Sequence, residues 1–414
     1  MGNGWGALSG ASKPALDFDP SLFPRVLKDF EARLSQNQSL DFDSLSFLLY
    51  AAAEKKEISR DFVKDKLLEA AQRFSNPQYF PFADSDQNFF IASQGSRLFF
   101  DAFSLFQIEE FKQSGRSLIK FLDGFYDPQL GAFVLSKEKG VGKALDNALG
   151  AWAFLSAWPH LKNQEIQKKA ECALKFIQEK LYDPLLGLVS QLPPNSSSLE
   201  YGRLADSSWA ALALTEAYLQ SGNKSYRDFA DTLAKYLFQE LWDRDKGAFL
   251  SRPGMESSQG GVSQQIILDN ATALEALWRL GYLKGQNTYF KWIDLALHRF
   301  LDQAGSKDAA VYLAKILDMR LQGRIELEIV GHAHETAFQK ILETLASLYA
   351  PRKTISFISP DDQDYILAHG LDAESYPRLF GCVDLKRRAD TARADRDSVA
   401  EVLNSAWPRI GDCP

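Results

Sequence analysis

Apolar residues recur at helical spacing along most of the chain, and a repeat organises the helices that they predict. The first mark of the repeat is an aromatic residue, an aspartate, three further residues and a glycine, and it begins at Tyr126, Tyr182 and Trp242. Its glycines, Gly131, Gly187 and Gly247, are 56 and 60 residues apart. A glycine at the end of such a mark is typical of a turn that stops a helix.

A second mark predicts a helix between successive turns. Asp146, Asp206 and Asp269 are 60 and 63 residues apart, and small residues recur after each of them. An aspartate can cap a helix by accepting bonds from its first N–H groups, and small residues let helices approach closely. A polar turn and a second amphipathic helix follow, for example over residues 226–241. The repeat therefore predicts a helical hairpin.

Further helix pairs are predicted outside the repeat, over residues 43–54 and 62–74, 96–113 and 117–126, and 287–303 and 307–321. Hairpins of this length either stack into an open solenoid or close into a ring. Long loops that carry tryptophan and glycine favour closure. The prediction is a mainly α protein, an (α/α)6-type toroid over residues 21–322 that follows an irregular lead-in over residues 1–20.

The C-terminal segment changes character. Strand-like alternation over residues 324–330, 354–358 and 379–384 is interleaved with helical patterns over residues 335–348, 361–368 and 395–406. Such alternation predicts a small parallel sheet, so residues 323–414 are expected to form an α/β appendage. The charged residues 386–397 are interpreted as a solvated linker or helix face.

Composition limits the class of protein. The 414 residues are 45% hydrophobic and carry a net charge of −7, a balance that indicates a globular protein and disfavours nucleic acid and anionic membranes as partners. No run of apolar residues is long enough to span a bilayer. The three cysteines form no C-x-x-C pair, which argues against a zinc knuckle or dithiol centre. We expect a cytoplasmic protein without a metal or cofactor.

The motifs resemble those of a known family. Residues 90–385 are similar to the C-terminal part of the spermatogenesis-associated, thioredoxin-domain-containing family, through Leu204-Ala-Asp206, the turn over 241–249, Asp269, and the segments 323–331 and 350–355. The resemblance implies an α/α barrel like that of N-acylglucosamine 2-epimerases and six-hairpin glycosidases. The family's thioredoxin domain and its C-x-x-C motif are missing here, so its redox role is not implied for this chain.

The resemblance and the repeat together suggest where a site would lie. Equivalent helix starts share one rim of a toroid, and two carboxylates that converge there can act as acid and base on a sugar. Asp206 and Asp269 are the predicted catalytic pair, and the residues predicted to bind substrate are Asp146, Asn147, Trp209 and Asn270. The alternatives are that each aspartate only caps its helix and that the tryptophan belongs to the core.

The histidines disfavour an epimerase mechanism. Epimerases of this fold use histidine as acid and base, and no histidine falls at a predicted barrel helix start. His332, His334 and Glu335 follow a strand, but without a supporting cluster they are interpreted as a loop and helix cap rather than a metal site.

Two functions remain open from the sequence. The first is a carbohydrate-binding or carbohydrate-active protein that uses the toroid cavity, with a sugar as its ligand. The second is a non-catalytic module that docks a separately encoded thioredoxin-like protein, since the domain fused in the family is missing here.

Overall fold

The computed structural model describes residues 18–19, 21–35, 41–74, 85–136, 141–192, 200–254, 264–301, 307–383 and 386–407. The lead-in predicted over residues 1–20 therefore lies almost entirely outside the described residues. Among the helices that are described, none is long and apolar enough to cross a bilayer.

The described helices form two layers, an inner ring and an outer one. Each helix of the inner layer contacts the next, and the last contacts the first, which closes the ring. The inner helices are α2 (Phe42–Ala53), α4 (Ser85–Phe106), α6 (Ala144–Leu161), α8 (Leu204–Ser221), α10 (Gln264–Lys284) and α12 (Lys307–Gln322). The outer helices are α1 (Leu22–Ser35), α3 (Arg60–Phe74), α5 (Glu109–Asp123), α7 (Gln164–Phe176), α9 (Lys224–Tyr236) and α11 (Asn287–Leu301). The predicted (α/α)6 toroid is confirmed.

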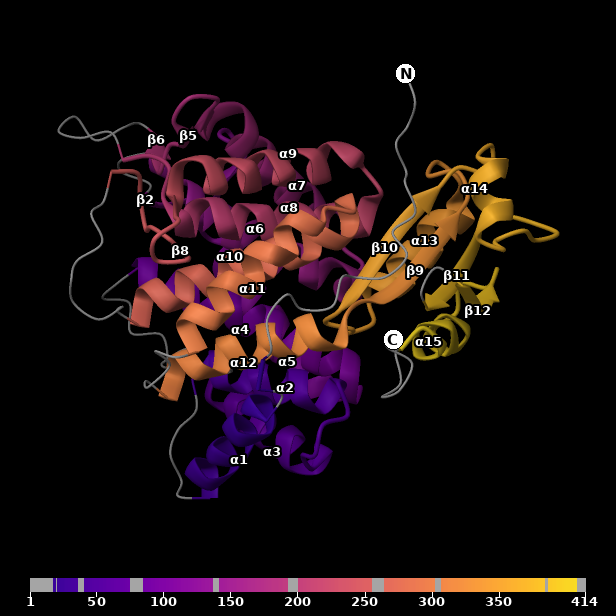
Figure 1. The fold of residues 1–414 in the computed structure, drawn as a ribbon, viewed down its shortest axis with the longest axis horizontal. Helices are drawn as coiled ribbons and strands as arrows, with labels where there is room; N and C mark the ends of the chain where they lie inside the picture. Colours follow the sequence, from indigo (N-terminus) through magenta and orange to yellow (C-terminus); the bar gives the residue numbers. More distant parts are fainter. Residues whose placement is uncertain are drawn as a thin grey trace.

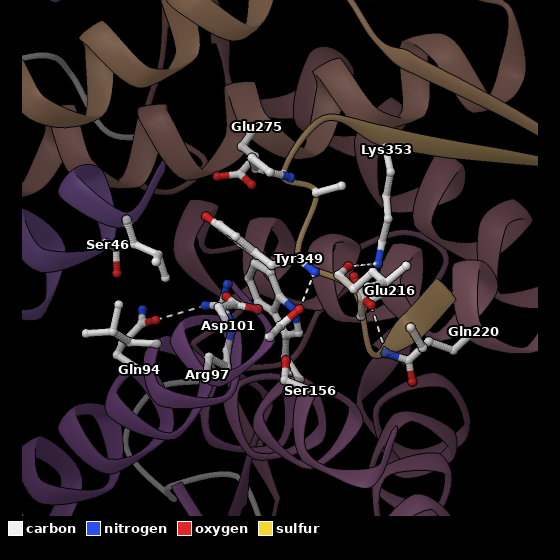
Figure 2. A pocket seen from close by; sticks show the side chains of 18 of the residues that line it. Ser46, Gln94, Arg97, Asp101, Ser156, Glu216, Gln220, Glu275, Tyr349 and Lys353 are labelled. Atoms are coloured by element: carbon white, nitrogen blue, oxygen red, sulfur yellow. Dashed lines mark hydrogen bonds between the residues drawn. The ribbon is translucent and has the colours of Figure 1, made fainter. Parts of the chain in front are cut away.

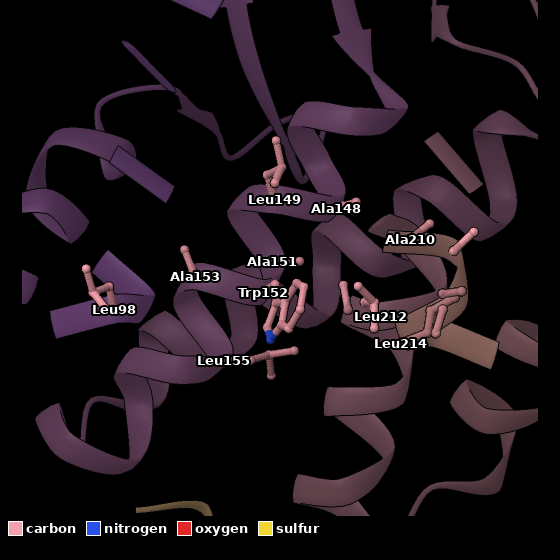
Figure 3. Packing of buried hydrophobic residues seen from close by; sticks show 14 of the residues in the cluster. Leu98, Ala148, Leu149, Ala151, Trp152, Ala153, Leu155, Ala210, Leu212 and Leu214 are labelled. Carbon is pink, nitrogen blue, oxygen red and sulfur yellow. The ribbon is translucent and has the colours of Figure 1, made fainter. Parts of the chain in front are cut away.

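Burial follows from the layer that each helix occupies. The inner helices α6 and α8 are buried on nearly every side, whereas the outer helices α5 and α9 bury one stripe and expose the other. Figure 3 shows how α6 and α8 meet, with Trp152 set between Ala148 and Ala151 on its own helix and Leu212 on the next. The small side chains allow the close approach that the repeat predicts.

One predicted pair of helices has different bounds. The patterns over 96–113 and 117–126 belong to α4 and α5, which are divided at Gln107. This residue has φ of +56°, and its side-chain amide donates to the carbonyl oxygens of Phe103 and Ser104 at 2.9 and 3.0 Å. A glutamine therefore ends α4, and no glycine or proline marks that end in the sequence.

The aromatic-aspartate-glycine marks form short β-hairpins. The paired strands are β1 (Tyr126–Asp127) with β2 (Ala132–Ser136), β4 (Tyr182–Asp183) with β5 (Gly187–Leu188), and β7 (Trp242–Asp243) with β8 (Ala248–Phe249). In each hairpin the aspartate carboxylate accepts bonds from two backbone N–H groups of the turn. Two more strands, β3 (Val141–Lys143) and β6 (Gln191–Leu192), extend the first hairpin into a four-stranded sheet.

The C-terminal residues form the predicted α/β appendage, but its sheet is mixed. The strands are β9 (Ile325–Val330), β10 (Lys353–Ile358), β11 (Arg378–Val383) and β12 (Lys386–Thr391), in the order β10-β9-β11-β12. Only β9 and β10 are parallel. The interpretation of residues 386–397 as a linker or helix face was wrong for β12, because a charged strand suits an exposed sheet edge. The helices are α13 (Thr336–Ala346), α14 (Gln363–Ala368) and α15 (Arg396–Ser405).

The appendage covers the end of the toroid at which the inner helices finish, opposite the short hairpins (Figure 1). Arg352 donates to the carboxylate of Glu54 at 2.6 Å, just after α2, and both side chains are buried. Ser104, near the end of α4, donates to the carbonyl oxygen of Ser347 at 2.8 Å. One end of the central space is therefore closed by the chain itself.

The repeat turns provide a stability test. Gly187 and Gly247 have φ of +77° and +60°, so any side chain there is strained. We expect Gly247→Val to lower the free energy of unfolding by more than about 1 kcal/mol. Gly187→Val should cost more, because a Cβ there would lie 2.6 Å from the ring of Tyr236. Urea unfolding of the two variants measures the difference, and equal losses of stability would contradict a clash between the new side chain at position 187 and the ring of Tyr236.

Candidate functional site

The repeated aspartates lie at the rim where the inner helices begin. Asp146 and Asp206 are the third residues of α6 and α8, and the N-cap residues are Lys143 and Arg203, neither of which makes a side-chain cap. The alternative that these two aspartates are helix caps is therefore wrong. Asp269 lies in the second turn of α10.

Burial at the rim disfavours the ionised form of its carboxyl groups. Burial raises the pKa of Asp146 to about 7, against the opposing effect of Lys143 and with further support from Asp86 and Asp206. Burial likewise raises the pKa of Asp206 to about 6, and the charge of Asp269 adds to the effect. Asp206 accepts a hydrogen bond from Ser190 at 2.7 Å, whereas Oδ2 of Asp146 is buried without a hydrogen-bond partner among the described residues. The predicted carboxylates thus influence one another across neighbouring helices.

The two predicted asparagines brace the hairpins against the helices. The side chain of Asn147 accepts from the N–H of Phe133 and donates to the carbonyl oxygens of Phe133 and Lys143. Asn270 makes the same contacts with Phe249 and Ile266. Both N–H groups of each amide are taken up by the backbone, so these side chains have a structural role.

Inside the ring, two adjoining hollows lie along the toroid axis. The larger, about 100 Å³, reaches the appendage, and the smaller, about 70 Å³, lies toward the rim. The residues that line both are Ser46, Gln94, Arg97, Trp152, Glu275 and Lys315. A hollow needs roughly 10–15 Å³ on this scale for each water molecule, so the space suits a small polar ligand.

Glu275 is the most strongly paired group of this cavity. Its two carboxylate oxygens accept from Arg279 at 2.9 Å and from Lys315 at 2.8 Å. Burial opposes its ionisation, but the two cations outweigh burial and hold the pKa of Glu275 well below its usual range. Glu275 is therefore an ionised carboxylate at neutral pH.

A second carboxyl group of the cavity has the opposite tendency. Burial raises the pKa of Asp101 to about 7, against the effect of Arg97 and with support from the charge of Glu216. Glu216 accepts a hydrogen bond from the amide of Gln220 at 2.7 Å. Figure 2 shows Asp101, Glu216 and Glu275 around the same space. Within the cavity, Asp101 thus keeps a proton near neutral pH, whereas Glu275 is ionised.

Aromatic rings extend from the surface to this cavity. Phe90, which is 37% exposed, meets the edge of Trp209 at 6.2 Å between ring centroids. Trp209 lies 5.5 Å from Trp152, and the guanidinium carbon of Arg97 lies 3.2 Å from the centroid of the Trp152 ring. Trp209 lines the smaller hollow, and Trp152 lines both.

The appendage supplies the far wall. Tyr349 reaches into the larger hollow from the segment between α13 and β10, and its backbone N–H is bonded to Ser104 (Figure 2). Lys353 donates to the carbonyl oxygens of Leu345 and Leu348 at 2.8 and 3.0 Å, and burial lowers its pKa. Burial also lowers the pKa of His160 to about 3, so this histidine is neutral.

Of the predicted site residues, Trp209 lines one of these two hollows, whereas Asp146, Asp206 and Asp269 line neither. The sequence reasoning missed Arg97, Asp101, Glu216 and Glu275. Their signal was charge within otherwise apolar helices: Glu275 and Arg279 are four residues apart, as are Arg97 and Asp101. Among the described residues, no group of three or more His, Cys, Asp or Glu side chains could hold a metal ion.

No protein-family model and no curated protein sequence matches the chain. Solved structures do match it. A GH76 α-mannanase of Bacteroides thetaiotaomicron is 10% identical, with a TM-score of 0.53 over 72% of this chain and 97% of that chain. The Lin0763 protein of Listeria innocua is 12% identical, with a TM-score of 0.52 over 70% of this chain and 88% of that chain. At these identities the likeness shows the fold, a six-hairpin α/α toroid.

The raised pKa of Asp146 has a consequence for stability. A folded-state pKa near 7 means that the folded protein keeps a proton that the unfolded chain has lost, so stability falls as pH rises from about 4 to 7. We expect Asp146→Asn to remove part of this fall and to be more stable, relative to the wild type, at pH 8 than at pH 4.5. Urea unfolding at both pH values measures it.

The matched control is Asp245→Asn, which changes an exposed aspartate in a repeat turn. It should leave the pH dependence unchanged. A pH dependence of Asp146→Asn that equals that of the wild type would show that this carboxyl group ionises as it does in the unfolded chain.

Proposed function

We propose that the chain binds a sugar in the cavity of the toroid. The observation that carries the proposal is the pair of indole rings, Trp152 and Trp209, 5.5 Å apart beside buried charged groups. Small-ligand sites combine apolar and aromatic walls with a few placed polar groups, and this cavity has both. The apolar faces of a sugar ring can stack on indole, while its hydroxyl groups bond to charged side chains.

The path of the rings supports binding from the rim. Phe90 and Trp209 lie between the surface and Trp152, whereas the appendage covers the opposite end. A sugar would therefore approach along Trp209. Activity on mannan is a property of the GH76 α-mannanase itself. The likeness between that protein and this chain extends only to the fold.

Acid–base chemistry on the bound sugar is the further part of this proposal. Such chemistry uses a carboxyl group that keeps its proton and a second one that is ionised. Asp101 and Glu275 have these properties in the cavity, and Asp206 and Asp269 remain the proposed catalytic pair at the rim. The protein is accordingly proposed as carbohydrate-binding, with turnover to be decided by the variants below.

A non-catalytic function is the second candidate. Both oxygens of Glu275 are held in ion pairs, and Tyr349 of the appendage lines the larger hollow. Several polar groups of the interior thus have partners within the protein and need no ligand. This favours a docking module. The family resemblance would make its partner a separately encoded thioredoxin-like protein, but no described contact identifies the docking surface.

Sugar binding is tested with Trp209, because this ring is only partly buried. Thermal shift and calorimetry with glucose, mannose, galactose and N-acetylglucosamine, as free sugars and as 6-phosphates or uronates, should identify at least one ligand. Trp209→Ala should weaken its binding at least ten-fold, whereas Trp209→Phe, which keeps a ring, should retain most of it. Absence of binding across the panel would favour the docking module.

Catalysis is tested with Asp206→Asn and Asp269→Asn. The fold should survive Asp206→Asn, because the amide oxygen can still accept the bond from Ser190. If these carboxyl groups transfer protons, turnover should fall by about 10² or more in each variant, since an amide cannot exchange the proton. Turnover of glycosides that is retained in both variants would remove the two residues as catalysts, and Asp101→Asn then becomes the next test.

A further inference from the structure

The charges that line the larger hollow do not balance. The cationic side chains are Arg97, Arg279, Lys315 and Lys353, and the acidic ones are Asp101, Glu216 and Glu275. One carboxylate, Glu275, is shared by two of the cations, Arg279 and Lys315. Lys353 is held by two carbonyl oxygens. The larger hollow therefore has one more cationic than acidic side chain, whereas in the smaller hollow Arg97 and Lys315 are matched by Asp43 and Glu275.

Like Lys353, Arg97 is a cation without a described acidic partner, but Arg97 lines both hollows. It donates one hydrogen bond to Gln94 at 2.8 Å and rests on the face of Trp152, but it makes no ion pair with a described carboxylate. Its Nε is buried and has no hydrogen-bond partner in the described part of the chain. The guanidinium is half-buried and is compensated only by the more distant charges of Asp101, Glu275 and Glu216, so it is free to pair with an anion in the hollow.

The nearest acidic group on the same helix compensates Arg97 only in part. Asp101 lies one turn further along α4, and its raised pKa leaves much of it protonated near neutral pH. It therefore does not neutralise the guanidinium fully. The planar fork of arginine matches a carboxylate or phosphate group, and its stacking on Trp152 fixes the plane of that fork.

We propose that the ligand of the toroid cavity is an anionic monosaccharide, whose carboxylate or phosphate group binds Arg97 while its ring lies against Trp209. This inference rests on the proposed sugar-binding function and specifies the class of sugar. The contact of Arg97 with Trp152, and of Trp152 with Trp209, places the charged group and the stacking surface next to each other in one continuous space. A neutral sugar leaves Arg97 unpaired and binds more weakly.

The test measures affinity by calorimetry on the full chain at constant ionic strength. The ligands are glucuronate, galacturonate, glucose 6-phosphate and mannose 6-phosphate, their neutral parents, and acetate and inorganic phosphate alone. At least one anionic sugar should bind ten-fold or more tighter than its neutral parent and than the bare anion. Uronates and phosphates separate the two sources of negative charge.

The variants assign that preference to Arg97. Arg97→Gln should reduce it to less than two-fold, while Arg116→Gln, an exposed arginine on α5, should leave it intact. Arg97→Lys keeps the charge without the fork and should retain part of the preference, which keeps the test valid if the glutamine variant folds poorly.

The outcomes that overturn the inference differ from those that overturn the proposed function. Equal binding of neutral and anionic sugars, with loss in Trp209→Ala, overturns the inference and leaves sugar binding in place. Bare anions that bind as tightly as the sugars, independently of Trp209, overturn the sugar-binding function. No binding by any member of the panel overturns both.

Discussion

The carboxylate of Glu275 joins the parts of this molecule that meet at its axis. It bonds Arg279 on its own helix and Lys315 on α12, and Arg279 in turn donates to the carbonyl oxygen of Pro351 in the appendage at 3.3 Å. An inner helix, its neighbour in the ring and the closing segment are thus linked through one buried anion. Removing one partner of a buried ion pair destabilises a fold by more than formation of the pair stabilises it. Such pairs therefore fix geometry more than they add stability.

The closing segment contains a second buried ion pair that joins the appendage to the toroid. Arg352 is buried and bonds Glu54 at the end of α2. It also bonds the carbonyl oxygens of Gln322, the last residue of α12, and of Gly323, which follows it. The appendage therefore docks on the toroid through charged groups that reach the ends of the inner helices, in addition to apolar contacts such as that of Phe357 with Tyr218. A ring that is closed at one end in this way leaves its opposite rim as the side from which a ligand can arrive.

The sequence predicted those parts of the fold that depend on local chemistry. The aspartates and glycines at positions 127 and 131, 183 and 187, and 243 and 247 form the repeat turns, because their bonds are made within a few residues. The strands β9, β10 and β11 and the helices of the appendage were predicted from the local pattern of apolar and polar residues, whereas the pairing of the strands into a mixed sheet was not. The edge strand β12 was missed, because its charged side chains resemble a solvated segment and only pairing with β11 makes it a strand.

The central cavity could not be predicted in that way. Arg97 and Asp101 lie on α4, where the repeat marks are faint, and Tyr349 comes from the appendage, so only closure of the ring brings them together. The repeated aspartates predicted that carboxyl groups would lie at the rim. The sequence did not show that Lys143 and Arg203 take the cap positions, which leaves Asp146 and Asp206 buried.

That arrangement gives the two ends of the toroid different electrostatic characters. Around the rim, burial favours neutral carboxyl groups, whereas deeper in the cavity Arg97 and Lys315 supply positive charge beside Glu275. Because Asp146 and Asp206 are buried and line neither of the two hollows, their ionisation changes the charge of the rim without placing that charge on the walls of the cavity.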